Sequence, residues 1–215
     1  MRKLALSIIL ILLFANMSIA AEVGINYNPS MVYNVTVETV EAYNSTTGQW
    51  VTVTDTPTTF NIASATSANT AIGNMVSNVT LPNGTYTQGR ITVSNQFGIK
   101  ACDNGGTNCT DGTQVLAGHT LATANAGSYA AASTVTTVIN FSTVGYPACP
   151  ATPICYAAGG AELVLTGNIS FVVGPGSVPK TMSVSFDVDG VLKYEAGPPA
   201  EYITPGLPGV NVSIE

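Results

Sequence analysis

The four cysteines carry the most definite chemistry in this sequence of 215 residues. An even number of cysteines in an exported chain is typical of disulfides. The segments "DNGGTN" and "PATPI" favour two local pairs, Cys102 with Cys109 and Cys149 with Cys155, because Gly, Asn and Pro let the chain turn back. Zinc is the alternative, but zinc sites usually use tighter cysteine pairs. We predict two disulfides and no metal site.

One of these loops, "CDNGGTNCTDG" (residues 102–112), is also rich in oxygen ligands. Asp103, Asn104, Asn108 and Asp111 offer the carboxylate and amide oxygens that Ca²⁺ prefers. Their spacing does not match an EF-hand, and the same residue types are common in turns. We interpret the segment as a turn, with a calcium loop as the alternative.

Residues that could support catalysis are few. His119 is the only histidine, so a catalytic triad or a histidine-based metal site has at most one imidazole. Asp187 and Asp189 lie two residues apart and would share one face of a strand, as paired catalytic carboxylates can. A turn beside them favours a solvated face instead. No nucleophile elbow, phosphate-binding loop or dinucleotide fingerprint occurs, so we predict no enzyme activity and no cofactor.

The aromatic residues allow two interpretations. Trp50 and the nine tyrosines could form a platform on which a sugar ring stacks. Large aromatic side chains more often fill the core of a β-sheet protein. We expect the core role for most of them and keep the sugar platform as the alternative.

The first twenty residues have the features of a secretory signal peptide. Arg2 and Lys3 give a positive start, residues 4–14 form an apolar run, and residues 18–20 supply the cleavage positions. A bilayer-spanning helix needs about 20 apolar residues, and the run is shorter than that. We expect residues 1–20 to be removed, the mature chain to have no transmembrane segment, and the protein to be secreted or held at the cell surface.

The charge composition excludes some partners. The sequence has 6 Lys and Arg and 12 Asp and Glu. Two of the cations lie in the leader, which leaves four against twelve in the mature chain, a net charge of −8. Because nucleic acid binding needs basic patches that neutralise phosphates, we predict no nucleic acid partner. A polar surface with so little charge suits self-association or a coat of sugar.

Asparagines in the sequon Asn-x-Ser/Thr are unusually frequent. The motif marks acceptors for N-linked glycans in organisms that have the machinery. Strands rich in Asn and Thr also place polar residues two apart for structural reasons alone. The candidate glycosylation sites are Asn34, Asn44, Asn78, Asn83, Asn108, Asn140, Asn168 and Asn211.

Alternating apolar and polar residues predict β-strands along most of the chain. Residues 31–44 and the run from Trp50 predict a hairpin around "STTGQ". In "TMSVSFDVDGVLKYEAG" the alternation is followed by Asp189-Gly190, which fits a tight turn and predicts a second hairpin. The best helix candidate, residues 120–133, is Ala-rich but contains Gly127, so it is either one short helix or a loop. We predict an all-β fold, a single antiparallel β-sandwich of immunoglobulin-like or jelly-roll-like type.

Both ends of the mature chain look strand-like. Residues 21–33 form an extended segment before the main domain, residues 34–215. Within it, Val23, Ile25 and Tyr27 are the candidate residues of a donor strand that inserts into the sheet of the next subunit. Repeated head to tail, that contact builds a filament. The alternative is that this segment pairs within its own domain.

The segments "VYNVTVETVEAYN", "FNIAS" and "LPNGTYTQGRITVSNQFGIKAC" loosely resemble secreted β-sandwich proteins of environmental microbes that share a Gly-Thr-Tyr turn before a strand with a basic residue. Here these are Gly84, Thr85, Tyr86 and Arg90. The layout also looks like that of pilin-like filament subunits that polymerise by donor strand. These resemblances imply a secreted surface protein that forms a homopolymer, and they imply no functional residues. An adhesin or a carbohydrate-binding module is the alternative.

Overall fold

The computed structural model describes residues 22–23, 31–64, 71–103, 105–128, 130–150, 153–177, 180–187, 192–195, 201–206 and 209–214. Its strands are β1 (Glu22–Val23), β2 (Val32–Asn44), β3 (Gln49–Thr54), β4 (Thr58–Asn61), β5 (Ala71–Val79), β6 (Gly84–Lys100), β7 (Asn108–Leu116), β8 (His119–Ala126), β9 (Val135–Val138), β10 (Ile154–Ala157), β11 (Glu162–Val173), β12 (Lys180–Asp187), β13 (Leu192–Glu195), β14 (Tyr202–Pro205) and β15 (Gly209–Ile214). Two 3-10 turns, η1 (Ile62–Ser64) and η2 (Ala158–Gly160), complete the described elements. The prediction of an all-β, antiparallel protein is confirmed.

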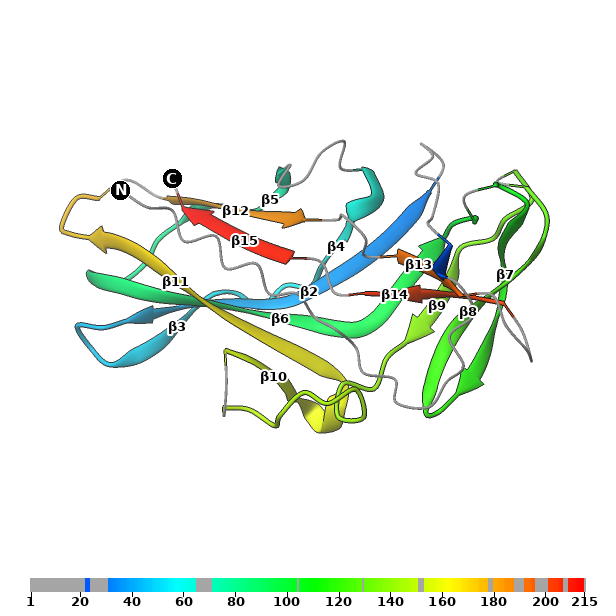
Figure 1. The fold of residues 1–215 in the computed structure, drawn as a ribbon. Helices are drawn as coiled ribbons and strands as arrows, with labels where there is room; N and C mark the ends of the chain where they lie inside the picture. Colours follow the sequence, from blue (N-terminus) through cyan, green and yellow to red (C-terminus); the bar gives the residue numbers. More distant parts are fainter. Residues whose placement is uncertain are drawn as a thin grey trace.

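The strands form a 12-stranded sheet and a 3-stranded sheet. The small sheet has the order β15-β12-β5 and runs along one side of the central strands of the large sheet (Figure 1). The finer prediction, an immunoglobulin-like or jelly-roll-like sandwich, stays a prediction.

Two long strands, β2 and β6, form the spine of the large sheet. They pair with each other antiparallel over most of their length. The other edge of β2 is shared by β3 and β4, and the other edge of β6 by β11 and β9. The spine therefore carries two sets of partners along its length, and the sheet twists strongly between them (Figure 1).

An irregularity in β2 decides which side chains face the core. Buried residues fall at Tyr33, Val35 and Val37, and then at Val40, Ala42 and Asn44. The alternation changes phase at positions 38–39, where the pairing with β6 also shifts register. Such an extra residue is a β-bulge, which bends the strand. Beyond it, Glu41 and Tyr43 lie on the face opposite to the buried residues.

The core has two parts. The larger cluster packs β2 and β6 against β8, β11, β13 and β14, with fully buried Tyr33, Phe97 and Ile203. The smaller cluster consists of Ala42, Leu81, Tyr86 and Val173. Burying these apolar side chains supplies the main favourable term for folding, at about 25 cal/mol per Å² of apolar surface.

Two predictions of local structure are wrong. The expected hairpin around Asp189-Gly190 does not form, because β12 pairs with β15 and β5 whereas β13 pairs with β14 and β1. Residues 120–133 contain no helix among those described. Its first half belongs to β8, which forms a hairpin with β7 around Ala117 and Gly118, both at positive φ. The hairpin of β2 and β3 is confirmed, with Tyr43 opposite Trp50.

The first described residues pair with the same molecule. Glu22 and Val23 lie antiparallel to Glu195 and Tyr194 of β13. The other two candidate donor residues, Ile25 and Tyr27, lie outside the described residues. The boundary expected at residues 33–34 falls inside β2, whose Tyr33 belongs to the core.

No helix of the described chain is long and apolar enough to cross a membrane.

Candidate functional site

The register of four neighbouring strands places a group of polar and aromatic residues on one face of the large sheet. Trp50 lies beside Tyr43, Tyr43 beside Gln88, and Gln88 beside Asn168. In the next row, Thr52 lies beside Glu41, Glu41 beside Arg90, and Arg90 beside Thr166. A third row adds Thr39 beside Thr92. We call these residues the polar face; it consists of Thr39, Glu41, Tyr43, Trp50, Thr52, Gln88, Arg90, Thr92, Thr166 and Asn168.

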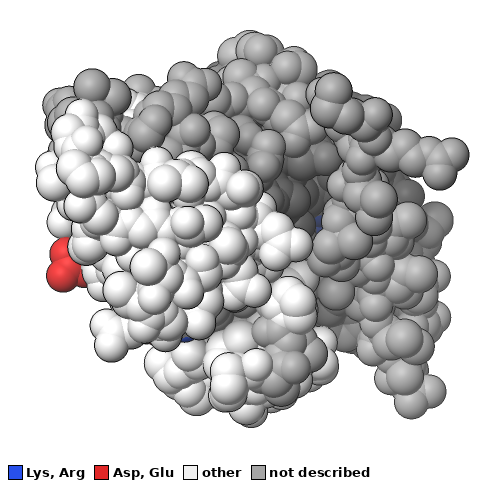
Figure 2. All heavy atoms as spheres, turned by 90° about the vertical axis from the view of Figure 1, so that its left-hand side faces the viewer, with Lys and Arg blue, Asp and Glu red and all other residues white. Residues whose placement is uncertain are grey.

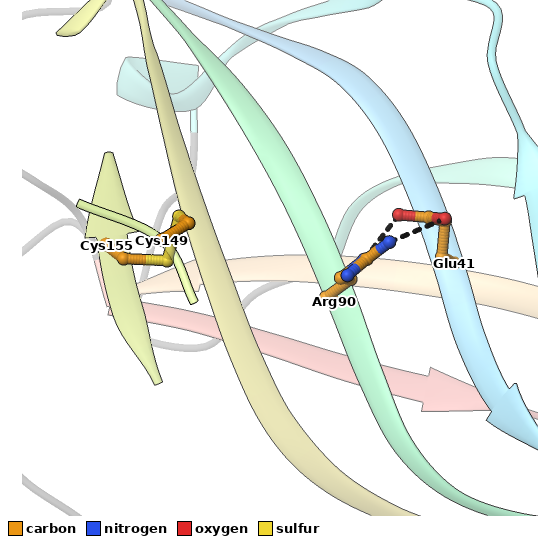
Figure 3. A network of polar contacts seen from close by, with 4 residues as sticks. All are labelled: Glu41, Arg90, Cys149 and Cys155. Atoms are coloured by element: carbon orange, nitrogen blue, oxygen red, sulfur yellow. Dashed lines mark hydrogen bonds and ion pairs between the residues drawn. A yellow bond between two sulfur atoms is a disulfide. The ribbon is translucent and has the colours of Figure 1, made fainter. Parts of the chain in front are cut away.

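Arg90 holds the centre of the polar face. Its Nη2 donates to Glu41 Oε1 at 2.9 Å, and its Nε donates to Glu41 Oε2. The two side chains point toward each other from β6 and β2 (Figure 3). The Arg90 guanidinium also lies over the Trp50 ring, 4.3 Å from its centroid. A bidentate ion pair and a cation–π contact together fix the planar guanidinium in one orientation.

The aromatic part of the polar face is a pair of rings. The Tyr43 and Trp50 ring centroids are 5.3 Å apart and the planes are tilted by 54°. Both side chains are half-buried, so part of each ring faces water. Trp50 is therefore not a core residue, in contrast to Tyr33 and Tyr86, which are fully buried.

Most other side chains of the polar face have no internal partner. Gln88 and Asn168 form no side-chain hydrogen bond with any described residue, and neither do the hydroxyls of Thr52, Thr92 and Thr166. No buried polar side-chain atom in the described part of the chain lacks a partner, so these groups are hydrated. The polar face thus presents donors and acceptors that are available to a ligand.

The reverse side of the same strands is packed. Val40 and Ile91 belong to the larger core cluster, and Gly89 lies under Ile169, whose atoms would be 3.5 Å from an added Cβ. In Figure 3, seen from the side of Arg90 and Glu41, β12 and β15 run behind the large sheet. The strands that carry the polar face are therefore packed against the core on their opposite face.

Both predicted disulfides are present. Cys102 is bonded to Cys109 and Cys149 to Cys155. The second bond lies beyond β11 as seen from Arg90, at the side of the sheet where β10 pairs with β11 (Figure 3). The described part of the chain has no free cysteine. Disulfides fit an oxidising compartment outside the cytosol.

The structure does not assemble a calcium loop from the predicted residues. Asp103 is buried, and its Oδ1 accepts from the Thr107 and Asn108 N–H groups at 2.7 and 3.1 Å. Its Oδ2 accepts from Thr107 Oγ1 and Asn108 Nδ2, both at 3.1 Å. Asp111 instead accepts from Thr123 and Asn125 of β8. Asn104 lies outside the described residues, and the described ones contain no metal-binding cluster. Asp103 thus closes the disulfide loop, as expected for a turn.

The histidine has a structural position. His119 is buried, its Nδ1 accepts from the Asn140 N–H at 3.1 Å, and its Nε2 lies 3.2 Å from Thr143 Oγ1. Burial lowers the pKa of the imidazole, because the charged form loses hydration. Asp187 ends β12, and Asp189 lies outside the described residues, so the predicted pair of carboxylates is not described.

The sequons differ in accessibility. Asn44 is fully buried: its Nδ2 donates to the Asn83 carbonyl at 3.2 Å, and Gly84 (φ 153°) leaves the space its amide occupies. The Asn108 side-chain amide donates a hydrogen bond to Asp103, and the Asn140 Oδ1 accepts one from the Ser142 N–H. Asn83 and Asn168 are exposed, and Asn34 is half-buried. The side chains of Asn78 and Asn211 lie outside the description. A glycan fits the surroundings of Asn83 and Asn168 but not those of Asn44.

Charged side chains are sparse on the described surface. On the face that Figure 2 shows, the described surface is mostly uncharged, with an acidic patch at its margin and small basic spots. No protein-family model, curated protein or solved structure matches this chain.

Most of the polar face was not expected from the sequence. The sequence marks Trp50 and the tyrosines as aromatics, Arg90 as a rare cation and Asn168 as a sequon, but it does not group them. Alternation in "TVETVEAY" indicates that Glu41 and Tyr43 share a face, but nothing in the sequence indicates which residues of β6 and β11 lie beside them.

Proposed function

We propose that this protein is an exported, non-catalytic surface protein that binds carbohydrate through its polar face, in the manner of an adhesin or a carbohydrate-binding module. The observation that carries the proposal is the combination of half-exposed Trp50 and Tyr43 with uncommitted amides and hydroxyls in register with them. Aromatic rings can stack on the C–H faces of a sugar, while amides and hydroxyls exchange hydrogen bonds with its hydroxyls.

A binding role also agrees with the rest of the described chain. The histidine is occupied in packing, and the buried carboxylate of Asp103 has its hydrogen bonds filled by its own loop. Rigid strands are good supports for a recognition surface, since their side chains lose little freedom on binding.

The test is retention of the secreted protein on immobilised polysaccharides. We expect the Tyr43→Ala, Gln88→Ala double variant to bind at least about tenfold more weakly, which corresponds to about 1.4 kcal/mol. Thr113→Ala, on the exposed side of β7, serves as the control and should bind like the wild type. Equal binding by all three proteins, or no retention on any polysaccharide, would refute the proposal.

Self-association by strand addition is the second candidate. Among the described strands, β3 pairs only with β2. The strand β7 pairs with β8, and its start is also covered on the other edge, where Cys109 bridges Cys102 and the Thr110 N–H donates to the Ala101 carbonyl. The open edges are therefore those of β3 and of β7 beyond Thr110. Neither strand contains Lys, Arg or Pro, residues that commonly block edges. The β7 residue Val115 is 71% exposed. An open edge of this kind can pair with a strand of another molecule, and head-to-tail repetition gives a filament.

Sedimentation velocity distinguishes this candidate. Polymers that grow with concentration, and that Val115→Lys or deletion of residues 21–30 abolishes, would support strand addition. A single monomeric species at high concentration would exclude it and leave carbohydrate binding unaffected.

A further inference from the structure

We infer that the ligand of the polar face is a neutral polysaccharide chain and that the Glu41–Arg90 pair sets this preference. The inference rests on the proposed function, since it specifies the ligand class of the same surface. It follows from three properties of the polar face: its balanced charge, its supply of hydrogen-bonding groups and its extent.

The charge of the polar face is balanced internally. Arg90 is its one cation, and Glu41 binds that cation with both carboxylate oxygens. The exposed fractions of the two side chains are 33% and 19%, so the pair is partly open to a ligand. An anionic sugar would have to displace Glu41 from the guanidinium. The free energy lost by leaving the Glu41 carboxylate unpaired exceeds the gain from the new attraction. The mature chain, with a net charge of −8, repels a polyanion further.

The hydrogen-bonding groups suit hydroxyls. Glu41 uses the Nε and one Nη2 proton of Arg90, and a guanidinium has five N–H groups. The remaining N–H groups can donate to sugar hydroxyl oxygens. The amides of Gln88 and Asn168 can both donate and accept, as a hydroxyl can. A chain of neutral sugars offers groups of this kind on every unit.

The extent of the polar face suits a chain rather than a single sugar. It covers four strands, which at about 4.8 Å between strands spans about 14 Å from β3 to β11. Along the strands its three rows are separated by about 7 Å. The aromatic pair lies at the β3 end and Asn168 at the β11 end of one row. A ligand that used both ends would cross the sheet as an extended oligosaccharide.

The experiment measures binding of the secreted protein to a soluble neutral glucan, a neutral mannan, polygalacturonate and alginate. We expect the wild type to bind at least one neutral polymer at least about tenfold more tightly than either acidic one. Binding to the neutral polymer should change less than about twofold between 50 and 500 mM salt, because no net charge is exchanged.

Glu41→Gln tests the role of the ion pair. It leaves Arg90 uncompensated, so binding to the acidic polymers should rise by about tenfold. Asp55→Asn is the charge-matched control, since it removes one negative charge at an exposed turn away from the polar face. A wild type that prefers the acidic polymers, or a neutral polymer whose binding collapses with salt, would overturn the inference while carbohydrate binding itself stands. Equal gains for both variants would overturn the role of the pair, and no binding to any polymer would refute the proposed function as well. If Glu41→Gln does not fold, the wild-type preference and its salt dependence still decide the ligand class.

Discussion

The two faces of the β2–β6 pair use adjacent residues for different purposes. On one face Val40, Ala42 and Ile91 are buried in the core. On the other face, Glu41, Tyr43 and Arg90 are half-buried. Arg90 pairs with Glu41 and lies over the Trp50 ring, which packs against Tyr43. The same two strands therefore carry a packed face, on which folding depends, and a polar face, which the proposed function uses for binding.

The bulge at positions 38–39 of β2 makes this separation possible. Without the change of phase, the buried positions 33, 35 and 37 would be continued by 39, 41 and 43, which would bury Glu41 and expose Val40. One extra residue thus decides that the ion pair is reachable from solvent.

The largest expected effect is on the packed face. Ile91→Ala should lower the free energy of unfolding by about 2–5 kcal/mol, because it removes buried methyl groups and leaves a cavity. Thr92→Ala, one residue further on the polar face, should change it by less than about 0.5 kcal/mol. Urea denaturation of the two variants measures the difference. Similar losses for both would show that the two faces are not energetically distinct.

The next effect concerns Asp103, whose buried carboxylate closes the first disulfide loop. Burial alone would raise its pKa, but hydrogen bonds from Asn108 and Thr107 outweigh this and hold the pKa below its usual value. A lowered pKa stabilises the folded state above about pH 3.9, the ordinary value for Asp, and this contribution disappears as the pH falls through the folded-state pKa. Asp103→Ala should cost about 1.5–3 kcal/mol at pH 7. A cost that is equally large at pH 2 would contradict this explanation.

A smaller effect is expected from the ion pair on the polar face. Because both partners are partly exposed, a double-mutant cycle with Glu41→Gln and Arg90→Met should give a coupling energy of about 1 kcal/mol or less. The cost of Arg90→Met alone also includes its contact with Trp50, and a second cycle with Trp50→Leu in the wild-type and Arg90→Met backgrounds isolates that contact. A coupling above about 3 kcal/mol would mean that the pair is needed for folding, and the comparison of the faces would fail.

The smallest effect is the pH dependence of His119. Its pKa is lowered by burial, so the unfolded chain takes up the proton first as the pH falls below about 6.5. Stability should therefore decline below that pH, and His119→Gln should reduce the slope. Thermal unfolding between pH 5 and 8 measures how stability changes with pH. If the variant shows the same pH dependence as the wild type, His119 is not its cause.

The sequence was sufficient for local features. Alternation predicted the strands of the spine and the hairpin of β2 and β3, and short turn-rich spacings predicted the two disulfides. It was insufficient where pairing is non-local. Asp189-Gly190 has ideal turn chemistry, yet the strands on either side join different sheets, because tertiary pairing decides the partner. The Ala-rich run in β8 suggested a helix because Ala is a good helix former. In the structure Ala122 and Ala124 are instead small strand residues that face the core.

The polar face shows the same limit. Its residues come from strands far apart in the sequence, so their arrangement depends on the register of three pairings. The contact of Arg90 with Trp50 crosses β2, and no sequence pattern specifies it.

The most direct test of the account is an NMR titration of the purified protein with a soluble neutral polysaccharide. We predict that the largest shift changes fall on the amide and side-chain signals of the polar face, including Tyr43, Gln88, Arg90 and Asn168, while the open edge of β7 is unaffected. Shift changes confined to β7 or to the loops, with those residues unchanged, would contradict the assignment of the polar face as the binding surface.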